Sequence, residues 1–316
     1  MTAAFWTKAP SMVDTVLLTG AGGFIGKAVL EKLGASRVRV KALDLGPPPP
    51  SLPANVEWIE GNIADQAVLE RAMSNVDQVI HLAFIMDLDG DQALACAETN
   101  LLGTVRLFDF ALRQKVRRVT WASSVMVYGP RTQYPAGPVS ESAEPMPRTP
   151  YGASKLALEW MARSYRRKGL ETVGLRFTTV FGPGRTRLGA AGFCVSLFEQ
   201  AVSGEIRIEE TDRRANMLYI DDAANACLQS LHAHGPLGDV YNIGGFECSA
   251  GDLVHTIQNC TAVPRVVATP GGSSPWPTEI SVEQARKDFG YTPAYDIDRA
   301  CLAYLRHLQV NATLKI

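Results

Sequence analysis

The stretch TGAGGFIG, residues 19–26, joins a short apolar run to a helix-like pattern over residues 23–33. The apolar run predicts a buried strand. Gly20, Gly23 and Gly26 are three residues apart, which suits a sharp turn, close approach of a phosphate to the backbone, and close helix–strand packing. Strand, glycine turn and helix together predict a dinucleotide site at the positive end of the helix.

A second strand pattern, residues 38–43, ends at Asp44. A carboxylate at this place can accept hydrogen bonds from both adenosine ribose hydroxyls and would repel a 2′-phosphate. The next residues are Leu45, Gly46 and Pro47, with no arginine among them. We therefore expect NAD, and not NADP, as the cofactor.

Strand and helix patterns alternate along the first half of the chain. Further strands are expected at residues 56–59, 79–83, 119–122 and 173–177, and helices at residues 66–73, 101–114 and 151–168. The alternation predicts an α/β fold, a Rossmann-type doubly wound parallel sheet with helices on both faces. Ligands gather at the carboxyl ends of such strands. Beyond the three glycines and Asp44, the expected cofactor contacts are Phe24, Ile25, Asn62, Ile63, Leu82, Ala83, Phe84, Asn100, Tyr151 and Lys155.

The strand–helix alternation becomes irregular after about Gly182. We expect a short N-terminal extension at residues 1–12 and an NAD-binding Rossmann domain at residues 13–182, with returning segments near residues 216–245. Residues 183–316 are expected to form mainly a smaller C-terminal substrate-binding lobe, made largely of helices.

The sequence YGASK, residues 151–155, places Tyr151 and Lys155 four positions apart on one face of a helix. A nearby ammonium favours the phenolate form of tyrosine, whose ordinary pKa is about 10. Lys155 can also hold the nicotinamide ribose. Ser124 ends the fifth strand and can hydrogen-bond the same substrate oxygen, with Ser123 in support. We interpret Tyr151, Lys155 and Ser124 as the catalytic residues, although such a helical pair alone arises often by chance.

The order of these motifs resembles the extended short-chain dehydrogenase/reductase family, also called the NAD-dependent epimerase/dehydratase family. The resemblance runs from about Val13 to about Gly245. It rests on residues 19–26, 79–83, 123–129, 150–155, 175–177 with 181–184, 219–222 and 241–245, and on Asn100 with Gly103-Thr104.

The resemblance implies a Rossmann domain followed by a substrate lobe. It implies Tyr151 as acid/base, Lys155 on the cofactor ribose and Ser124 on the reacting oxygen. Asn100 lies where the family keeps an asparagine near the cofactor site. Family members often form homodimers through two long helices, which here correspond to residues 101–114 and 151–168.

At two positions that concern the substrate, the sequence departs from the family pattern. Thr179 stands where the family's nucleotide-sugar enzymes usually carry an asparagine that meets a substrate phosphate. Arg213 and Arg214 are out of register with the arginine that those enzymes usually carry. A buried diphosphate needs aligned donors and positive charge, so these changes weaken a nucleotide-sugar interpretation. Two apolar residues follow Ser124 where dehydratases of the family have carboxylates, so 4,6-dehydration is not expected.

The expected substrate residues form an apolar wall with a cationic rim. Ile85, Met86 and Met126 belong to the wall, together with Phe84, and Ser123, Ser124 and Thr179 complete the polar side. Arg185 and Arg187 can meet a small anion such as a carboxylate.

The leading hypothesis is an NAD-dependent dehydrogenase acting on a secondary alcohol or ketone of a small, sugar-acid-like or partly apolar substrate. One alternative is a nucleotide-sugar epimerase with tightly bound NAD. An alternative of another class is a non-catalytic NAD-binding sensor, which ranks last because the tyrosine and the lysine are both present.

The composition excludes several other classes. The net charge is -1 and the pI about 6.5, so no basic excess points to nucleic acid or an anionic membrane. No apolar run approaches the ~18 residues of a membrane span. The six cysteines show no zinc spacing, so no metal is expected. We expect a cytoplasmic protein with a small-molecule substrate.

Overall fold

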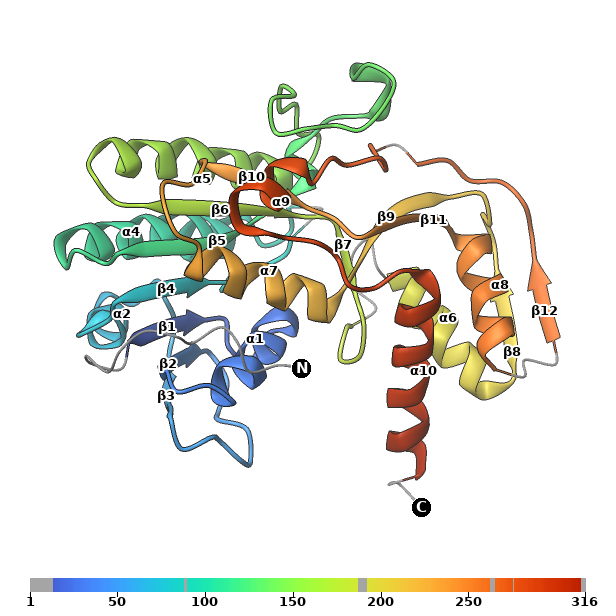
Figure 1. The fold of residues 1–316 in the computed structure, drawn as a ribbon, viewed down its shortest axis with the longest axis horizontal. Helices are drawn as coiled ribbons and strands as arrows, with labels where there is room; N and C mark the ends of the chain where they lie inside the picture. The colour runs from blue at the N-terminus through green and yellow to red at the C-terminus, as the bar shows by residue number, and fades with distance from the viewer. Residues whose placement is uncertain (1–13, 88–89, 187–191, 262–264, 275, 314–316) are drawn as a thin grey trace.

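The computed structural model describes residues 14–87, 90–186, 192–261, 265–274 and 276–313. A seven-stranded parallel sheet with helices on both faces forms the larger part, and a smaller lobe lies beside it (Figure 1). The expected Rossmann-type α/β fold is confirmed.

The large sheet has the strand order β10-β6-β5-β4-β1-β2-β3. Its strands are β1 (Thr15–Thr19), β2 (Arg39–Asp44), β3 (Val56–Glu60), β4 (Gln78–His81), β5 (Arg118–Ser124), β6 (Thr172–Phe177) and β10 (Val240–Ile243). All neighbours pair in parallel, as mostly apolar strands buried on both faces predict. The winding direction reverses between β1 and β4, and open parallel sheets bind ligands in the crevice at that point.

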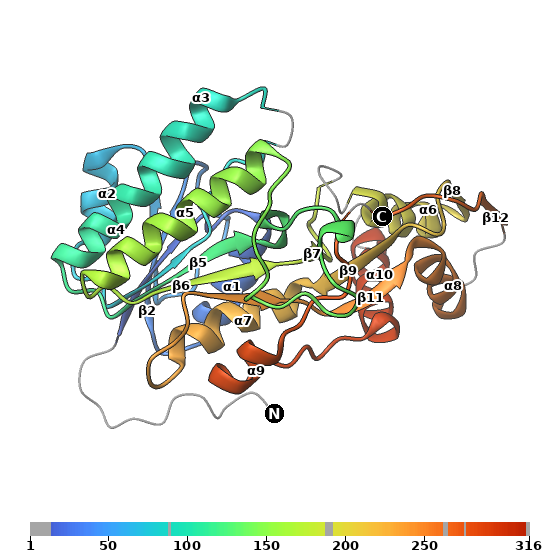
Figure 2. The same ribbon diagram turned by 90° about the horizontal axis from the view of Figure 1, so that it is seen from above.

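Helices cover the two faces of this sheet. α1 (Phe24–Gly34) packs with α7 (Ile220–His232) on one face, and α4 (Thr104–Arg113) packs between α2 (Gln66–Met73) and α5 (Pro150–Arg167) on the other (Figure 2). Successive strand residues serve opposite faces: Val16 and Leu18 join the core under α1 and α7, whereas Leu17 joins the core under the other three helices. Within the described ranges, no helix combines the length and apolar character needed to cross a membrane.

The helix predicted at residues 101–114 begins earlier than expected. α3 (Ala93–Cys96) and a π-helical segment, η1 (Ala97–Gly103), run directly into α4. α3 is only four residues long and none of them is buried, so it is too short to show the apolar periodicity by which a helix is recognised in sequence. π-helical turns often occur at functional sites, and η1 carries Asn100.

The smaller lobe contains more strand than the expected largely helical lobe. Its elements are β7 (Thr179–Phe181), α6 (Gly192–Ser203), β8 (Glu205–Ile208), β9 (Arg214–Tyr219), β11 (Phe246–Ser249), α8 (Ala250–Cys260), β12 (Arg265–Ala268) and α10 (Ile297–Thr313). α9 (Glu283–Phe289) returns to the large sheet and packs against β10 (Figure 1). One sheet has the order β11-β9-β7 and another pairs β12 with β8. These strands are short and pair over long sequence distances, so periodicity alone marks them poorly.

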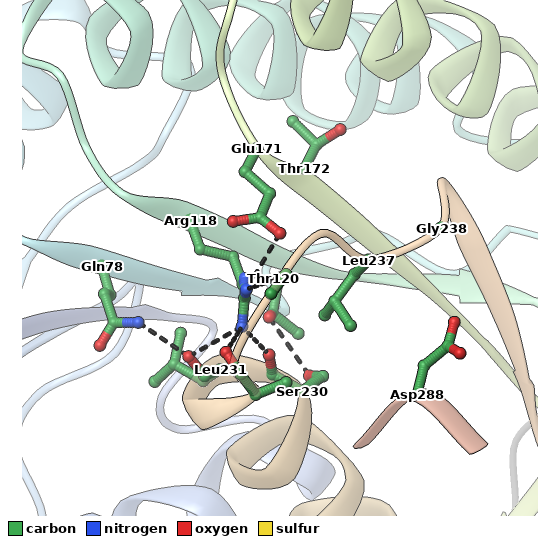
Figure 3. A network of polar contacts seen from close by, with 12 residues as sticks. Gln78, Arg118, Thr120, Glu171, Thr172, Ser230, Leu231, Leu237, Gly238 and Asp288 are labelled. Carbon is green, nitrogen blue, oxygen red and sulfur yellow. Dashed lines mark hydrogen bonds and ion pairs between the residues drawn. The ribbon is translucent and has the colours of Figure 1, made fainter. Parts of the chain in front are cut away.

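Arg118 of β5 fastens the end of α7 to the large sheet (Figure 3). Its guanidinium donates to the carbonyl oxygens of Ser230 and Leu231 at 2.6 and 3.2 Å, and pairs with Glu171 at 2.9 Å. Gln78 of β4 donates to the Leu231 carbonyl at 2.8 Å. The last carbonyls of a helix lack partners within it and attract cations, so these donors hold the returning helix against β4 and β5.

Candidate active site

The glycine turn lies at the carboxyl end of β1. Gly20 has φ +70°. A Cβ at this residue would lie 2.6 Å from the backbone nitrogen of Ala83, which follows β4. A Cβ on Gly26 would lie 1.9 Å from the Gly20 carbonyl oxygen, so α1 packs too closely on the turn for a side chain. α1 begins with Phe24 and Ile25 after Gly23, and no side chain caps its first amides. These amides form a cradle for a diphosphate.

Asp44 ends β2 beside this cradle. One carboxylate oxygen accepts the backbone N–H of Gly22 at 2.8 Å, and the other accepts that of Gly46 at 3.2 Å. A carboxylate has about four lone-pair sites, so two remain for ribose hydroxyls. Cradle and carboxylate therefore fit the two ends of the adenosine diphosphate half of NAD.

The other expected cofactor residues surround the same edge of the sheet. The Asn62 side chain accepts a hydrogen bond from the backbone N–H of Ala64 at 2.9 Å. Ile63 is a buried core residue. The backbone N–H groups of Leu82 and Ala83 lie 3.1 and 3.3 Å from the carbonyl and hydroxyl oxygens of Thr19, to which they donate. The segment after β4 is thus fastened to the strand that carries the glycine turn.

Asn100 acts on this segment as well. Its side chain accepts the Ile85 N–H at 2.8 Å and donates to the Ile85 carbonyl at 2.9 Å. The residue is buried. Because both ends of the amide are engaged, Asn100 positions the segment containing Phe84 and Ile85.

Tyr151, Ser124 and Lys155 converge at the carboxyl ends of the central strands. Tyr151 lies in the first turn of α5, close enough to Ser124 at the end of β5 for this serine to lower the pKa of Tyr151. Lys155 is one turn further along α5, and its Nζ donates to the Ala122 carbonyl at 2.7 Å. The structure therefore brings the three expected catalytic residues together.

Burial dominates the electrostatics of this group. It raises the pKa of Tyr151, while nearby Ser124 and the Arg185 charge act to lower it. Burial also lowers the pKa of Lys155 well below its ordinary value, and Glu159 opposes this change. Two groups with shifted pKa values side by side, at the edge of a parallel sheet where ligands bind, are typical of an active site.

A buried polar network that sequence reasoning missed lies behind these residues. Ser123 donates to Glu159 at 2.6 Å, so its hydroxyl is engaged on the α5 side of β5. Glu159 forms two hydrogen bonds with Arg176, at 2.8 and 2.6 Å, and Arg176 donates to the Tyr128 hydroxyl at 2.7 Å. Tyr128 in turn donates to Asn242 at 2.9 Å. A single arginine in the apolar strand β6 was the available signal, because a buried charge requires a partner.

Of the expected apolar wall, Phe84 and Ile85 line a cavity together with Tyr151. The Phe84 ring packs edge-on against the Tyr151 ring, with 5.5 Å between centroids. Ile85 and Met126 are half-buried, whereas Met86 is 46% exposed. A cavity of about 140 Å³ opens beside Tyr151. Its lining is Phe84, Ile85, Asp87, Gly90, Ala93, Cys96, Ala97, Asn100, Leu101, Pro150, Tyr151 and Ser154.

Of the two arginines expected to form a cationic rim, the structure describes Arg185. The Arg185 guanidinium lies 5.3 Å from the centroid of the Phe24 ring and close enough to Tyr151 to lower its pKa. Arg185 is therefore near both Tyr151 and Phe24 at the start of α1. Thr179 begins β7 and is half-buried. Arg187 lies outside the described residues.

A family model matches residues 16–244 and is described as the NAD dependent epimerase/dehydratase family. The chain belongs to this family. It is an enzyme of the extended short-chain dehydrogenase type, and its cofactor is NAD. The cradle and Asp44 fit that cofactor.

Three similar proteins extend over nearly the whole chain. UDP-glucose 4-epimerase of Azospirillum brasilense is 29% identical, over 93% of this chain and 92% of that protein. The structure of MoeE5 in complex with UDP-glucuronic acid and NAD is 26% identical with a TM-score of 0.80, and covers 94% of this chain and 99% of its own. A monomeric L-threonine 3-dehydrogenase from a metagenome, in its apo form, is 25% identical with a TM-score of 0.82 at the same coverage.

Arg213 and Arg214, at the start of β9, contact partners within the lobe. Arg214 pairs with Glu247 of β11 at 2.8 Å. Arg213 lies 3.9 Å from Glu210. The next residue, Ala215, lies opposite Cys248 and brings no charge. This family member thus uses both arginines in its own ion pairs.

Proposed function

We propose that this chain interconverts a secondary alcohol and a ketone on a small substrate, with Tyr151 exchanging the proton. The observation that carries the proposal is the convergence of Tyr151, Ser124 and Lys155 beside the glycine cradle. Tyrosine and serine hydroxyls on one oxygen can both orient it and move its proton.

In the oxidation direction, the substrate hydroxyl is held between Ser124 and Tyr151, and the Tyr151 phenolate accepts its proton. In the reduction direction, Tyr151 returns the proton to the carbonyl oxygen. Lys155 favours the phenolate through its positive charge and holds the nicotinamide ribose. Bound NAD supplies the hydride acceptor for this chemistry.

Three observations support a small substrate. Arg213 and Arg214 already pair with carboxylates of the lobe, and Thr179 brings only a hydroxyl to its position. The cavity beside Tyr151 measures about 140 Å³, which suits a group of a few heavy atoms. Arg185 lies close enough to Tyr151 to lower its pKa and would recognise a carboxylate.

A nucleotide-sugar epimerase with tightly bound NAD is the second candidate. It is favoured by the named activity of the Azospirillum relative and by the UDP-glucuronic acid bound to MoeE5. Such an enzyme would need to bind a diphosphate through donors other than Arg213 and Arg214.

Thermal unfolding with separate additions of NAD, NADP, UDP and UDP-glucose tests the proposal. A ligand that binds the folded state raises the midpoint by mass action. We expect stabilisation by NAD and none by the UDP compounds, followed by NAD reduction with at least one member of an alcohol and hydroxy-acid panel. Strong stabilisation by UDP-glucose would favour the epimerase. A panel without any NAD reduction would contradict the dehydrogenase.

We further propose a homodimer through the outer side of α4 and α5, which face away from the sheet in Figure 2. Trp160 is 61% exposed, and Leu102 and Met161 are also exposed. Trp160→Glu should convert dimer to monomer at micromolar concentration, because interface tryptophans often contribute about 2 kcal/mol or more. Sedimentation velocity measures this change. Val267→Glu, at an exposed apolar residue of β12, should leave the mass unchanged, and a monomeric wild-type protein would exclude the dimer.

A further inference from the structure

Lys155 lies against an aromatic face. Its side chain is buried, with 2% exposed, and its Nζ is 3.3 Å from the centroid of the Phe84 ring. The Phe84 ring meets the Tyr151 ring nearly at a right angle, 86°, and the Lys155 Nζ lies 5.7 Å from the Tyr151 centroid. Phe84 therefore touches both members of the catalytic pair.

The ammonium of Lys155 has lost its water shell, and burial lowers its pKa. Its Nζ donates a hydrogen bond to the Ala122 carbonyl at 2.7 Å. The face of an aromatic ring carries partial negative charge, and its attraction for a cation increases when water is excluded. The ring of Phe84 thus supplies electrostatic support at a place where hydration is lost.

The charged and titratable groups around Phe84 and Lys155 do not replace the support that the ring gives to the ammonium. On α5, Glu159 favours the charged form of Lys155 but also binds Arg176 of β6 through both oxygens. His81 of β4 bonds to Thr19 and Thr104, and its pKa falls to about 3 through burial and the Lys155 charge, so it stays neutral. Arg185, after β7, acts on Tyr151.

We propose that Phe84 is a positioning residue that holds the Lys155 ammonium through its ring face and thereby sets the pH range in which Tyr151 accepts a proton. The inference rests on the proposed function in one respect, the proton exchange by Tyr151. The backbone on both sides of Phe84 is fixed, because Ala83 donates to Thr19 and Asn100 binds Ile85 on both sides. The ring is therefore anchored independently of the lysine.

A merely space-filling phenylalanine would depend on shape and not on ring charge. Site-specific replacement of Phe84 by 3,4,5-trifluorophenylalanine separates the two roles, since fluorine withdraws negative charge from the ring face and changes its shape little. The variant is measured as holoenzyme with saturating NAD, beside Phe84→Leu and the conservative Phe84→Tyr.

We expect the acid limb of kcat/KM for alcohol oxidation to move upward by about one pH unit in the trifluoro and leucine variants. This corresponds to about tenfold lower kcat/KM at a fixed pH on that limb. The sign follows because weaker support of the ammonium gives less positive charge beside Tyr151 and so a higher pKa for its hydroxyl. Phe84→Tyr keeps the ring face and should restore the wild-type profile.

The ¹⁵Nζ resonance of Lys155, followed through a pH titration, measures the ammonium without turnover. Its pKa should fall in the trifluoro variant and stay near wild type in Phe84→Tyr. An unchanged Lys155 titration in the trifluoro variant would overturn the role of Phe84, whatever the activity. A shifted titration in an enzyme whose Tyr151→Phe variant remains fully active would instead overturn the proton role of Tyr151 and leave the Phe84–Lys155 contact standing.

Discussion

Replacing Tyr151 by phenylalanine should lower kcat by roughly a hundred- to ten-thousand-fold, the usual contribution of a positioned acid or base. The change removes only the phenolic oxygen, and the edge-on contact with the Phe84 ring remains. The glycine cradle and Asp44 are untouched, so the Kd for NAD should be nearly unchanged. Steady-state kinetics on the alcohol found by the panel, with a separate NAD titration, measure the two effects.

Tyr165→Phe is the matched control, because it removes the same atom from the same helix. The Tyr165 hydroxyl donates to Asp109 at 2.8 Å, on the side of α5 that packs against α4. Its loss should cost about 1 kcal/mol of stability and leave kcat unchanged. A Tyr151→Phe variant that binds NAD and turns over at the wild-type rate would exclude the proposed acid/base.

The cofactor side of the site was predictable because its constraints are local in sequence. Gly26 packs against the backbone of Gly20, only six residues earlier. The pattern of strand, turn and helix is visible in residues 16–33. Tyr151 and Lys155 lie one helical turn apart, so their shared face follows from helix geometry alone. The position of Asp44 follows from the next strand of the same unit.

The supporting network depends on contacts that no local pattern contains. Ser123 and Glu159 are 36 residues apart, and Arg176 and Tyr128 are 48 apart. Arg118 reaches carbonyls more than a hundred residues away. A charged residue in an apolar strand predicts that a partner exists, but the partner's identity depends on the tertiary fold.

The substrate side was hard to predict for a further reason, the register of strands. Shifting a strand by one residue moves every side chain to the other face. In β9, Arg214 lies opposite Ser249 and pairs with Glu247, whereas its neighbour Ala215 lies opposite Cys248. The sequence shows that the arginines are displaced from the family position, and only the pairing with β11 shows where they go.

Glu159→Gln should lower the free energy of unfolding by about 3–5 kcal/mol, the usual cost of removing one partner from a buried ion pair. Glu159 and Arg176 are each 1% exposed, so the substitution leaves a buried guanidinium without a counter-charge. It also weakens the acceptor of the Ser123 hydroxyl. Urea unfolding at neutral pH measures the loss.

Glu283→Gln is the matched control, because Glu283 pairs with Arg286 while its side chain is 72% exposed. An exposed pair of this kind contributes about 0–1 kcal/mol. The double variant Glu159→Leu with Arg176→Met should recover much of the loss, since apolar side chains can replace a buried pair at little cost. Equally small losses of unfolding free energy in Glu159→Gln and Glu283→Gln would mean that water reaches the Glu159–Arg176 pair. Recovery in the double variant would show that the cost of Glu159→Gln lies in the unpaired Arg176 charge and not in the shape of the site.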